Sequence, residues 1–327
     1  MQMLLVLVTG YILASSPPVR ALLSNVAGLA GSAGSAILLV SVVSLAASWI
    51  NWGFGLVVGA IFARELARKV KVDYRLLVAA AYSGFIIWHG GISGSIPLAI
   101  STPEHFAEAQ IGLIPTSQTI FSSWNLIIVA TLFVLVPLVN RMMLPTEDEF
   151  VLVDPQQLKD REPAQVLGTG ATPAERLENS RILMWAIGIP GLLWLAQHFL
   201  AGGGINLNVI NFLFLFLGIT LHGTARSLLG ALDDGVKGGA GIVIQFPFYA
   251  GIMAIMTGSG LAASLSGWFA SISTADTLPF WSFIAAGIVN VFVPSGGGQW
   301  AVQAPVMLPA AEALGADVAR VAMGVAW

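Results

Sequence analysis

Long stretches of this chain carry no charged side chain, and they alternate with short segments in which the charges are concentrated. The uncharged stretches are 21–63, 76–103, 109–140, 182–225, 238–275 and 277–311. A helix of about 20 residues crosses the roughly 30 Å hydrocarbon core of a bilayer, so each stretch is long enough to do so. The pattern predicts an all-α polytopic membrane protein.

Two of these stretches are interrupted by polar residues and glycines. The first reads Asn-Trp-Gly-Phe-Gly over 51–55, and the second reads Asn-Val-Phe-Val-Pro-Ser-Gly-Gly-Gly-Gln over 290–299. Asn51 and Asn290 are 239 positions apart. Backbone that is not helical is tolerated inside a bilayer only where it is buried in protein or lines a cavity. Paired interruptions of this kind are typical of secondary transporters built from inverted repeats.

Each interruption predicts a re-entrant hairpin. The segment 33–63 would be about 46 Å long as one helix, which is too long for a single crossing, whereas two arms that meet at 51–55 fit. We expect this hairpin to enter and leave from the cytoplasmic side. The segment 279–314 has the same design, with its tip near 294–298, and its ends fall on the external side. The two tips are therefore expected to face each other.

The basic residues orient the remaining spans. Loops rich in Lys and Arg face the cytoplasm, which places 64–75, 141–181 and 223–237 on that side. The loops at 101–110 and 201–204 hold neither residue and are predicted to be external. The spans between the loops then alternate in direction: 76–100, 111–140, 182–200, 205–222 and 239–257.

The order of the spans and loops divides the chain into three segments. Residues 1–140 form a first repeat, 141–181 a hydrophilic cytoplasmic linker and 182–327 a second repeat. Gln2–Gly10 before the first hairpin resembles Gln245–Gly251 before the second, at an offset of about 240. We expect the first repeat to be incomplete at its N-terminus and the second at its C-terminus.

A third polar interruption breaks the span 76–100 near its external half. It reads Trp-His-Gly-Gly-Ile-Ser-Gly-Ser-Ile-Pro over 88–97 and predicts a discontinuous helix beside the first hairpin. His89 could carry a proton or could simply be a hydrogen-bonded packing residue.

Composition narrows the chemistry. Hydrophobic residues make up 56% of the chain, charged residues 9%, the net charge is -3 and cysteine is absent, so neither a nucleic-acid partner nor thiol chemistry is expected. No Asp or Glu lies in the middle of a span, which argues against a carboxylate proton relay. Because no span holds Lys or Arg, an anionic substrate would have to be met by helix N-termini and by neutral donors.

The tips supply such groups. Unwinding frees N–H groups that favour an anion and carbonyls that can hold a cation, and glycine lets the backbone approach a ligand. We expect no cofactor and no structural metal, but a coupling ion, either Na⁺ near Asn51, Asn290 and Ser295 or H⁺ through His89. The candidate substrate- and ion-binding residues are Asn51, Gly53, Gly55, His89, Ser93, Ser95, Asn290, Ser295, Gly296, Gly297, Gly298, Gln299 and Gln303.

The segments 50–60, 245–251 and 293–300 resemble bacterial short-chain fatty acid transporters of the acetoacetate and butyrate uptake type, within the ion transporter superfamily. The resemblance implies ion-coupled symport of short monocarboxylates across the inner membrane by alternating access, and a homodimer. It implies binding groups at the hairpin tips, at Asn51, Gly53, Asn290, Ser295 and Gly296. A dicarboxylate or another anion is the alternative substrate.

An enzyme is the alternative from another class. Gly-Ile-Ser-Gly over 91–94 matches the serine motif of rhomboid-type intramembrane proteases, which need a histidine on another helix. His198 and His222 are available but fall at predicted span ends. Because paired hairpin tips have no role in that mechanism, we expect a transporter and not an enzyme.

Overall fold

The computed structural model describes residues 2–154, 157–158 and 172–327, and within these ranges the chain forms helices and loops but no strand. The all-α prediction is confirmed. Short 3-10 helices are η1 (Gly84–Gly90), η2 (Thr116–Gln118) and η3 (Glu147–Glu149). The α-helices are α1 (Gln2–Ser15), α2 (Pro17–Ala27), α3 (Ala33–Ile50), α4 (Trp52–Lys69), α5 (Tyr74–Ser83), α6 (Ser95–Ser101), α7 (Glu108–Ile111), α8 (Ser123–Met142), α9 (Pro173–Glu178), α10 (Arg181–Leu200), α11 (Leu207–His222), α12 (Ala225–Gly258), α13 (Leu261–Ile272), α14 (Leu278–Asn290), α15 (Gly296–Leu314) and α16 (Val318–Ala326).

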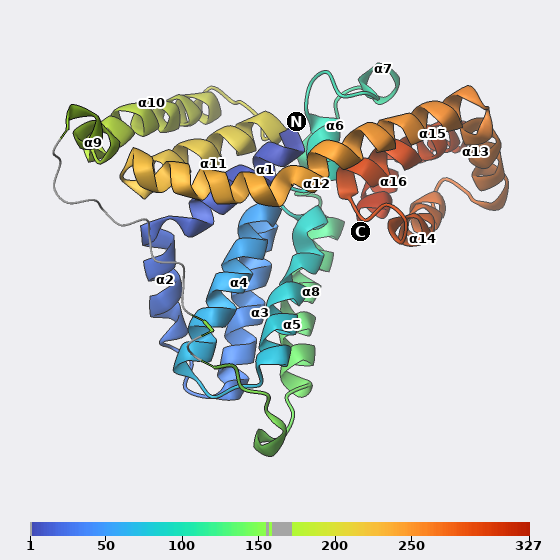
Figure 1. The fold of residues 1–327 in the computed structure, drawn as a ribbon. Coiled ribbons are helices and arrows are strands. Elements are labelled where there is room, and N and C mark those ends of the chain that lie inside the picture. Colours follow the sequence, from blue (N-terminus) through green and yellow to red (C-terminus); the bar gives the residue numbers. More distant parts are fainter. Residues whose placement is uncertain (1, 155–156, 159–171) are drawn as a thin grey trace.

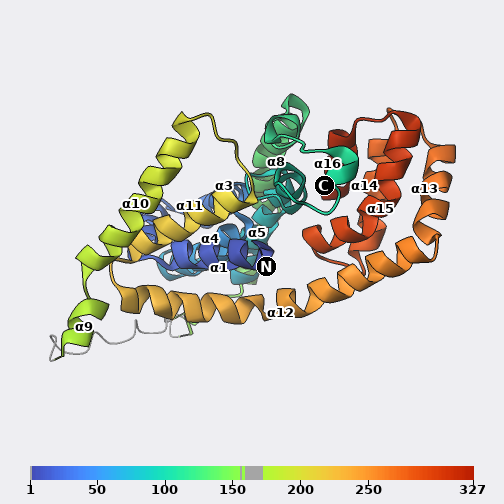
Figure 2. The same ribbon diagram turned by 90° about the horizontal axis from the view of Figure 1, so that it is seen from above.

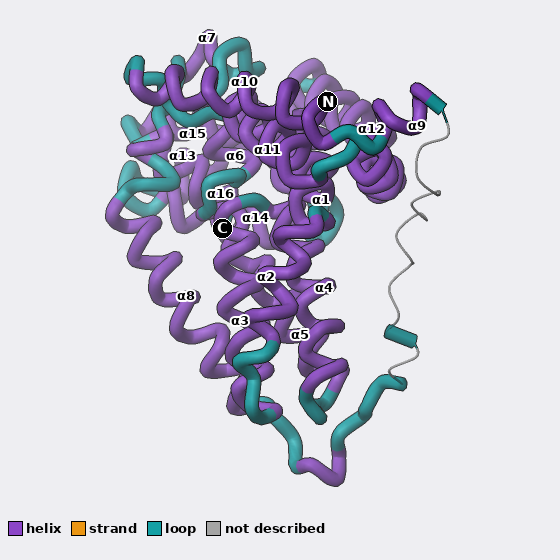
Figure 3. Tube along the Cα trace, turned by 90° about the vertical axis from the view of Figure 1, so that its left-hand side faces the viewer, coloured by secondary structure: helices purple, strands orange, loops and turns teal. Residues whose placement is uncertain are grey.

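A bundle of α2, α3, α4, α5 and α8 forms one part of the molecule (Figures 1 and 3). Helices α3 and α4 lie side by side and turn back on each other at Asn51, as a hairpin does. Small residues let them approach: a Cβ on Gly59 of α4 would lie 2.8 Å from Ser44 Oγ of α3. Close packing at small residues is how helices associate where lipid removes the hydrophobic driving force.

The helices of the second half lie across this bundle (Figure 1). Helices α10, α11 and α12 run over the end at which the α3–α4 turn lies, and α1 packs between them and that turn. Viewed from above, α12 extends from the α10–α11 pair to the group α13 to α16 (Figure 2). The turn of the first hairpin is thereby covered by α1 and by helices of the second half of the chain.

Several helices are suited to a bilayer. Five described helices are long and apolar enough to cross a membrane, or up to six if α1 and α2, bent by 64°, count as one span. Large apolar side chains of α8 are exposed, including Ile127 and Val134. In a membrane protein such side chains face lipid. How the two hairpins sit relative to a bilayer remains a prediction.

The helix boundaries differ from the expected ones at two spans. Helix α8 begins at Ser123 and not near 111, because 112–122 contains Pro115 and a short polar 3-10 turn. Helix α12 spans 34 residues, about 51 Å, and begins at Ala225 within a loop predicted to be cytoplasmic. Thr224 caps its first turn by accepting from the Ser227 N–H at 3.2 Å. The expected spans 182–200 and 205–222 correspond to α10 and α11.

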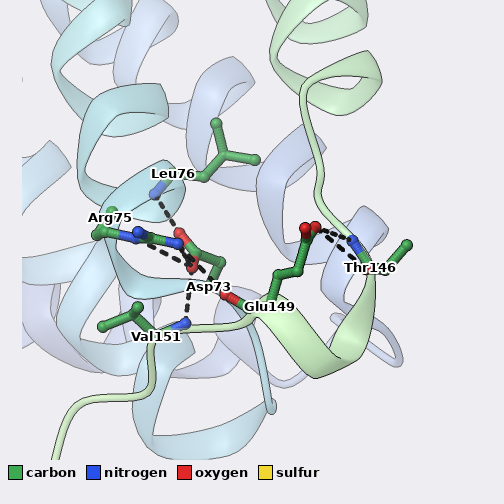
Figure 4. Close-up of polar contacts among 6 residues, drawn as sticks. All are labelled: Asp73, Arg75, Leu76, Thr146, Glu149 and Val151. Atoms are coloured by element: carbon green, nitrogen blue, oxygen red, sulfur yellow. Dashed lines mark hydrogen bonds and ion pairs between the residues drawn. The ribbon is translucent and has the colours of Figure 1, made fainter.

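The start of the linker is fastened to the bundle at Asp73 (Figure 4). The buried carboxylate accepts from the backbone N–H of Leu76 at 2.9 Å, from that of Val151 at 2.8 Å and from the Arg75 guanidinium at 2.9 Å. Burial alone would raise the pKa of Asp73, but the hydrogen bonds from Arg75, Val151 and Leu76 outweigh it and lower the pKa below 3.8. The ionised carboxylate thus joins α5 to the chain that follows α8.

Candidate functional site

Asn51 forms the tip of the first hairpin and links its two arms. Its N–H donates to Ala47 O at 2.9 Å at the end of α3, and its Oδ1 accepts from the Phe54 N–H at 2.9 Å at the start of α4. The side chain is fully buried, and Nδ2 has no hydrogen-bond partner among the described residues. The asparagine oxygen therefore caps a helix, and the asparagine nitrogen remains an unsatisfied donor.

Helix α1 packs on this tip at a distance that only glycine permits. A Cβ on Gly10 would lie 2.7 Å from Asn51 Oδ1, and a Cβ on Gly53 would lie 2.7 Å from Leu7 Cα. The resemblance of Gln2–Gly10 to Gln245–Gly251 therefore involves a segment that lies directly against the first tip.

The discontinuous helix closes on the same tip. Helix α5 ends at Ser83, η1 continues to Gly90, and α6 begins at Ser95, so the predicted break is present. Ser93 Oγ accepts from the Trp52 N–H at 2.8 Å, and the Ile92 N–H donates to Trp49 O at 2.7 Å. Ser93 thus satisfies a free N–H at the start of α4. Ser95 is buried at the first residue of α6.

The second hairpin breaks between Asn290 and Gly296, as predicted. Ser295 precedes α15 with extended backbone, and its hydroxyl does not cap that helix. The Asn51 oxygen, in contrast, caps α4. Asn290 Nδ2 donates to Gln299 Oε1 at 2.8 Å, and Gln299 Nε2 donates to Ala286 O at 2.9 Å and to Gln303 Oε1 at 3.1 Å. Gln299 therefore joins the arms α14 and α15.

Three consecutive glycines bring the second tip against other parts of the molecule. A Cβ on Gly296 would overlap His89 Nε2 of the discontinuous helix. On Gly297 it would lie 3.2 Å from the Phe246 ring, and on Gly298 it would overlap the Tyr249 ring. Since Phe246 and Tyr249 belong to Gln245–Gly251, this segment covers the second tip just as Gln2–Gly10 covers the first.

His89 lies where the two halves meet. The residue is 7% exposed, Nδ1 contacts the carbonyl oxygen of Ala326, and Nε2 has no partner among the described residues. The neighbouring Gly90 carbonyl accepts from Asn125 Nδ2 at 3.0 Å, and Asn125 Oδ1 accepts from Trp327 Nε1 at 3.0 Å. The histidine is held on one side while its second nitrogen faces the start of α15.

Buried polar atoms without partners gather in the segments of this region. Among the described residues they include Ser48 Oγ, Trp49 Nε1, Asn51 Nδ2, Trp52 Nε1, His89 Nε2 and Trp300 Nε1. The indole and amide nitrogens can only donate. A buried donor left unpaired costs about 1–3 kcal/mol, so a site rich in them favours a ligand that brings acceptor oxygens.

The candidate residues thus separate into two groups. The first tip, Ser93 and Trp52 are joined to one another, and Gly296 reaches this group through His89. Asn290, Gln299 and Gln303 form a separate amide cluster in the second hairpin, where Asn290 is exposed and both glutamines are buried. Gly55 packs on Ser48, on the α3 side of the first hairpin.

Five residues of this region were not among the sequence candidates. The indoles of Trp49, Trp52 and Trp300 are buried donors without a partner among the described residues, a property that the sequence does not reveal. Asn125, in contrast, is an amide within an uncharged stretch, and such a polar residue in a span is by itself a signal of function. Ser48 lies one helical turn before Asn51.

The proposed serine protease geometry is absent from the described residues. His222 Nε2 contacts Ile12 O at 2.7 Å and Nδ1 contacts Ser227 Oγ at 2.9 Å, while His198 Nε2 contacts Gly204 O at 3.1 Å. Neither ring contacts Ser93, whose hydroxyl accepts from Trp52.

These features define the chain as an all-α multi-pass membrane protein whose interrupted helices hold buried polar atoms without partners among the described residues. The family model described as "Short chain fatty acid transporter" matches residues 1–327, and the chain belongs to this family. It is a family of transporters and not of enzymes, as the sequence predicted.

Two curated relatives agree with this assignment. The chain is 44% identical over 330 residues to the "Putative short-chain fatty acid transporter" of Escherichia coli strain K12, and 40% identical over 337 residues to the protein of the same name from Haemophilus influenzae strain Rd. Each alignment covers 100% of this chain and 75% of the relative. No solved structure matches the chain.

Proposed function

We propose that the protein carries short monocarboxylates, such as butyrate or acetoacetate, across the bacterial inner membrane by ion-coupled alternating access. The carboxylate binds near the first tip and His89. The observation that supports this substrate is the set of buried donors without partners, at Trp49, Asn51, Trp52 and Trp300. Carboxylate oxygens are acceptors only, so they complement these donors.

Aromatic side chains beside the first tip suit a short acyl chain. The Trp52 and Trp88 rings pack edge to face, with centroids 5.7 Å apart, and Trp88 stacks on Phe85 at 5.2 Å. Indole rings offer an apolar face beside a donating edge, which matches an acid that is apolar except at one end. Neutral donors bind a carboxylate less tightly than a buried Lys or Arg would. The substrate can therefore be released after it has crossed the membrane.

The coupling ion is Na⁺ or H⁺. Asn51 Oδ1 is used as a helix cap, so a sodium ion would depend on backbone carbonyls and hydroxyls, such as that of Ser295. His89 Nε2 offers a site for a proton at the contact with Gly296. A homodimer is the proposed assembly, taken from the family resemblance.

Uptake of radiolabelled butyrate and acetoacetate into proteoliposomes tests the proposal, with a Na⁺ gradient and a pH gradient applied separately. Trp300→Phe keeps an aromatic ring but removes the donor. Losing one hydrogen bond to a carboxylate costs about 1.5–3 kcal/mol, so the half-saturating concentration should rise about tenfold or more.

Trp185→Phe is the control, because Trp185 is 48% exposed on α10. Saturable uptake that responds to Trp300→Phe and not to Trp185→Phe would support the site. If folded protein carried no short monocarboxylate but did carry a dicarboxylate, the substrate proposed here would be wrong.

A further inference from the structure

A groove runs along the first hairpin, from the end of its tip at Gly55 toward Arg64. It has a volume of about 210 Å³ and lies between α3, α4, α5 and η1, with Ser48, Gly55, Ala60, Arg64, Val78 and Phe85 among its lining residues. At roughly 30 Å³ per water, it has room for about seven water-sized groups. Butyrate has six non-hydrogen atoms and acetoacetate has seven.

The inner end of the groove lies close to the first tip. Ser48 precedes Asn51 by one helical turn, and Gly55 packs on it so closely that a Cβ on the glycine would overlap Ser48 Oγ. Ser48 is fully buried, and its hydroxyl has no partner among the described residues. Ser44, one turn earlier in the same wall, donates to the Ala81 carbonyl oxygen. Of these two serine hydroxyls, the one nearer the tip has no partner among the described residues.

The other end of the groove carries its positive charge. Among the described residues that line the groove, Arg64 is the one charged residue, and it is half-buried. It lies nine residues after Gly55 on α4, about 13 Å along the helix, in the basic loop region predicted to face the cytoplasm. Its guanidinium donates to Leu158 O at 3.1 Å. The remaining lining is mostly apolar.

We propose that this groove is a second, cytoplasm-facing subsite for the carboxylate substrate. An acid that leaves the first tip toward the cytoplasm meets the Ser48 hydroxyl and then the Arg64 guanidinium, while its acyl chain lies along Ala60 and Val78. An arginine at the cytoplasmic end attracts an anion out of a site that holds it by neutral donors alone. This inference rests on the proposed function.

Labelling of a single introduced cysteine tests the subsite, because the sequence contains no cysteine. Ala60→Cys places a thiol on the groove, and Ala79→Cys places one at an exposed position of α5 that does not line it. A membrane-impermeant maleimide should react with Cys at position 60 from the cytoplasmic side of oriented vesicles. Butyrate should slow this reaction and leave the reaction at position 79 unchanged.

Substitutions of Arg64 and Arg68 form a matched pair of variants that test the role of the arginine in the groove. Arg64 and Arg68 both donate to the Leu158 carbonyl oxygen, but only Arg64 lines the groove. Arg64→Gln should raise the butyrate concentration needed for protection about tenfold, because it removes a charge-assisted hydrogen bond to the carboxylate. Arg68→Gln should leave that concentration unchanged.

The outcomes separate this inference from the proposed function when butyrate uptake is measured on the same proteins. Uptake without protection at position 60 would overturn the subsite alone, as would protection that survives Arg64→Gln. Protection by octanoate or phospholipid and not by butyrate would assign the groove to lipid. Absence of both uptake and protection would overturn the proposed function and the subsite with it.

Discussion

The first glycine of α15, Gly296, is in direct contact with the imidazole of His89, so closely that any Cβ at position 296 would overlap Nε2. This contact joins the second hairpin to the discontinuous helix of the first half. Because α15 begins at this glycine, the imidazole faces the N-terminal end of a 19-residue helix. That end favours negative charge and disfavours a protonated imidazole, so a proton on His89 Nε2, which has no partner among the described residues, would need the carboxylate of the substrate beside it.

The contact predicts that Gly296→Ala strongly reduces transport. The added methyl group also meets Trp88, 2.9 Å away, so neither ring can move aside without disturbing the tip. Butyrate uptake in proteoliposomes should fall at least about tenfold. Gly287→Ala in α14 adds a methyl group in open space and should leave uptake unchanged. Normal uptake by Gly296→Ala would show that the second tip is not part of the site.

Asn51 permits its capping role to be separated from its donating role. Asn51→Asp keeps an oxygen that can accept from the Phe54 N–H, but an ionised carboxylate has no donor. Asn51→Ala loses both. We expect both variants to lose butyrate binding; the alanine also loses the cap, at about 1 kcal/mol, while the aspartate keeps the cap but is destabilised by its buried, unpaired charge. Thermal unfolding in detergent, measured beside uptake, checks this; an aspartate variant that binds butyrate normally would contradict the donor role.

Close packing of α1 on the first tip predicts a stability effect at Gly10. Gly10→Ala would place its methyl group 2.7 Å from Asn51 Oδ1, against backbone that cannot easily move. Overpacking of this kind typically costs about 1–3 kcal/mol, and the melting temperature of the purified protein should fall accordingly. Gly251→Ala in α12 meets nothing within 4 Å and is the matched control. Equal melting temperatures would mean that α1 does not hold the tip.

Sequence patterns predicted the helix breaks well because these depend on local chemistry. Asn51 with two glycines and Ser295 with three mark positions at which a helix must end or restart, and both breaks occur there. The predicted start of α8 was wrong, because the absence of charge in 109–140 does not reveal that Pro115 and its polar neighbours form a loop. The donor role of Trp300 was also missed, since it depends on which atoms three-dimensional packing leaves unpaired.

Asp73 predicts how acid affects the junction of linker and bundle. Its pKa is lower in the folded protein than the ordinary 3.8, because Arg75, Val151 and Leu76 stabilise the ionised form more than burial penalises it. A carboxylate of this kind stabilises the fold fully above pH 3.8, and its contribution is lost as the pH falls through the lower folded pKa. The junction should therefore hold at neutral pH and weaken only in strong acid.

Asp73→Asn should remove this contribution at neutral pH, since an amide offers only one oxygen where the carboxylate accepts from three groups. Proteolysis of the linker should then be faster at pH 7 for the variant than for the wild type, and the two rates should converge only once the pH falls below the lowered folded pKa of Asp73. Asp276→Asn changes an exposed carboxylate elsewhere and should leave the rate unaltered at both pH values. If Asp73→Asn resisted protease as well as the wild type at pH 7, the carboxylate would not fasten the linker, and its three hydrogen bonds would contribute nothing beyond those of solvent.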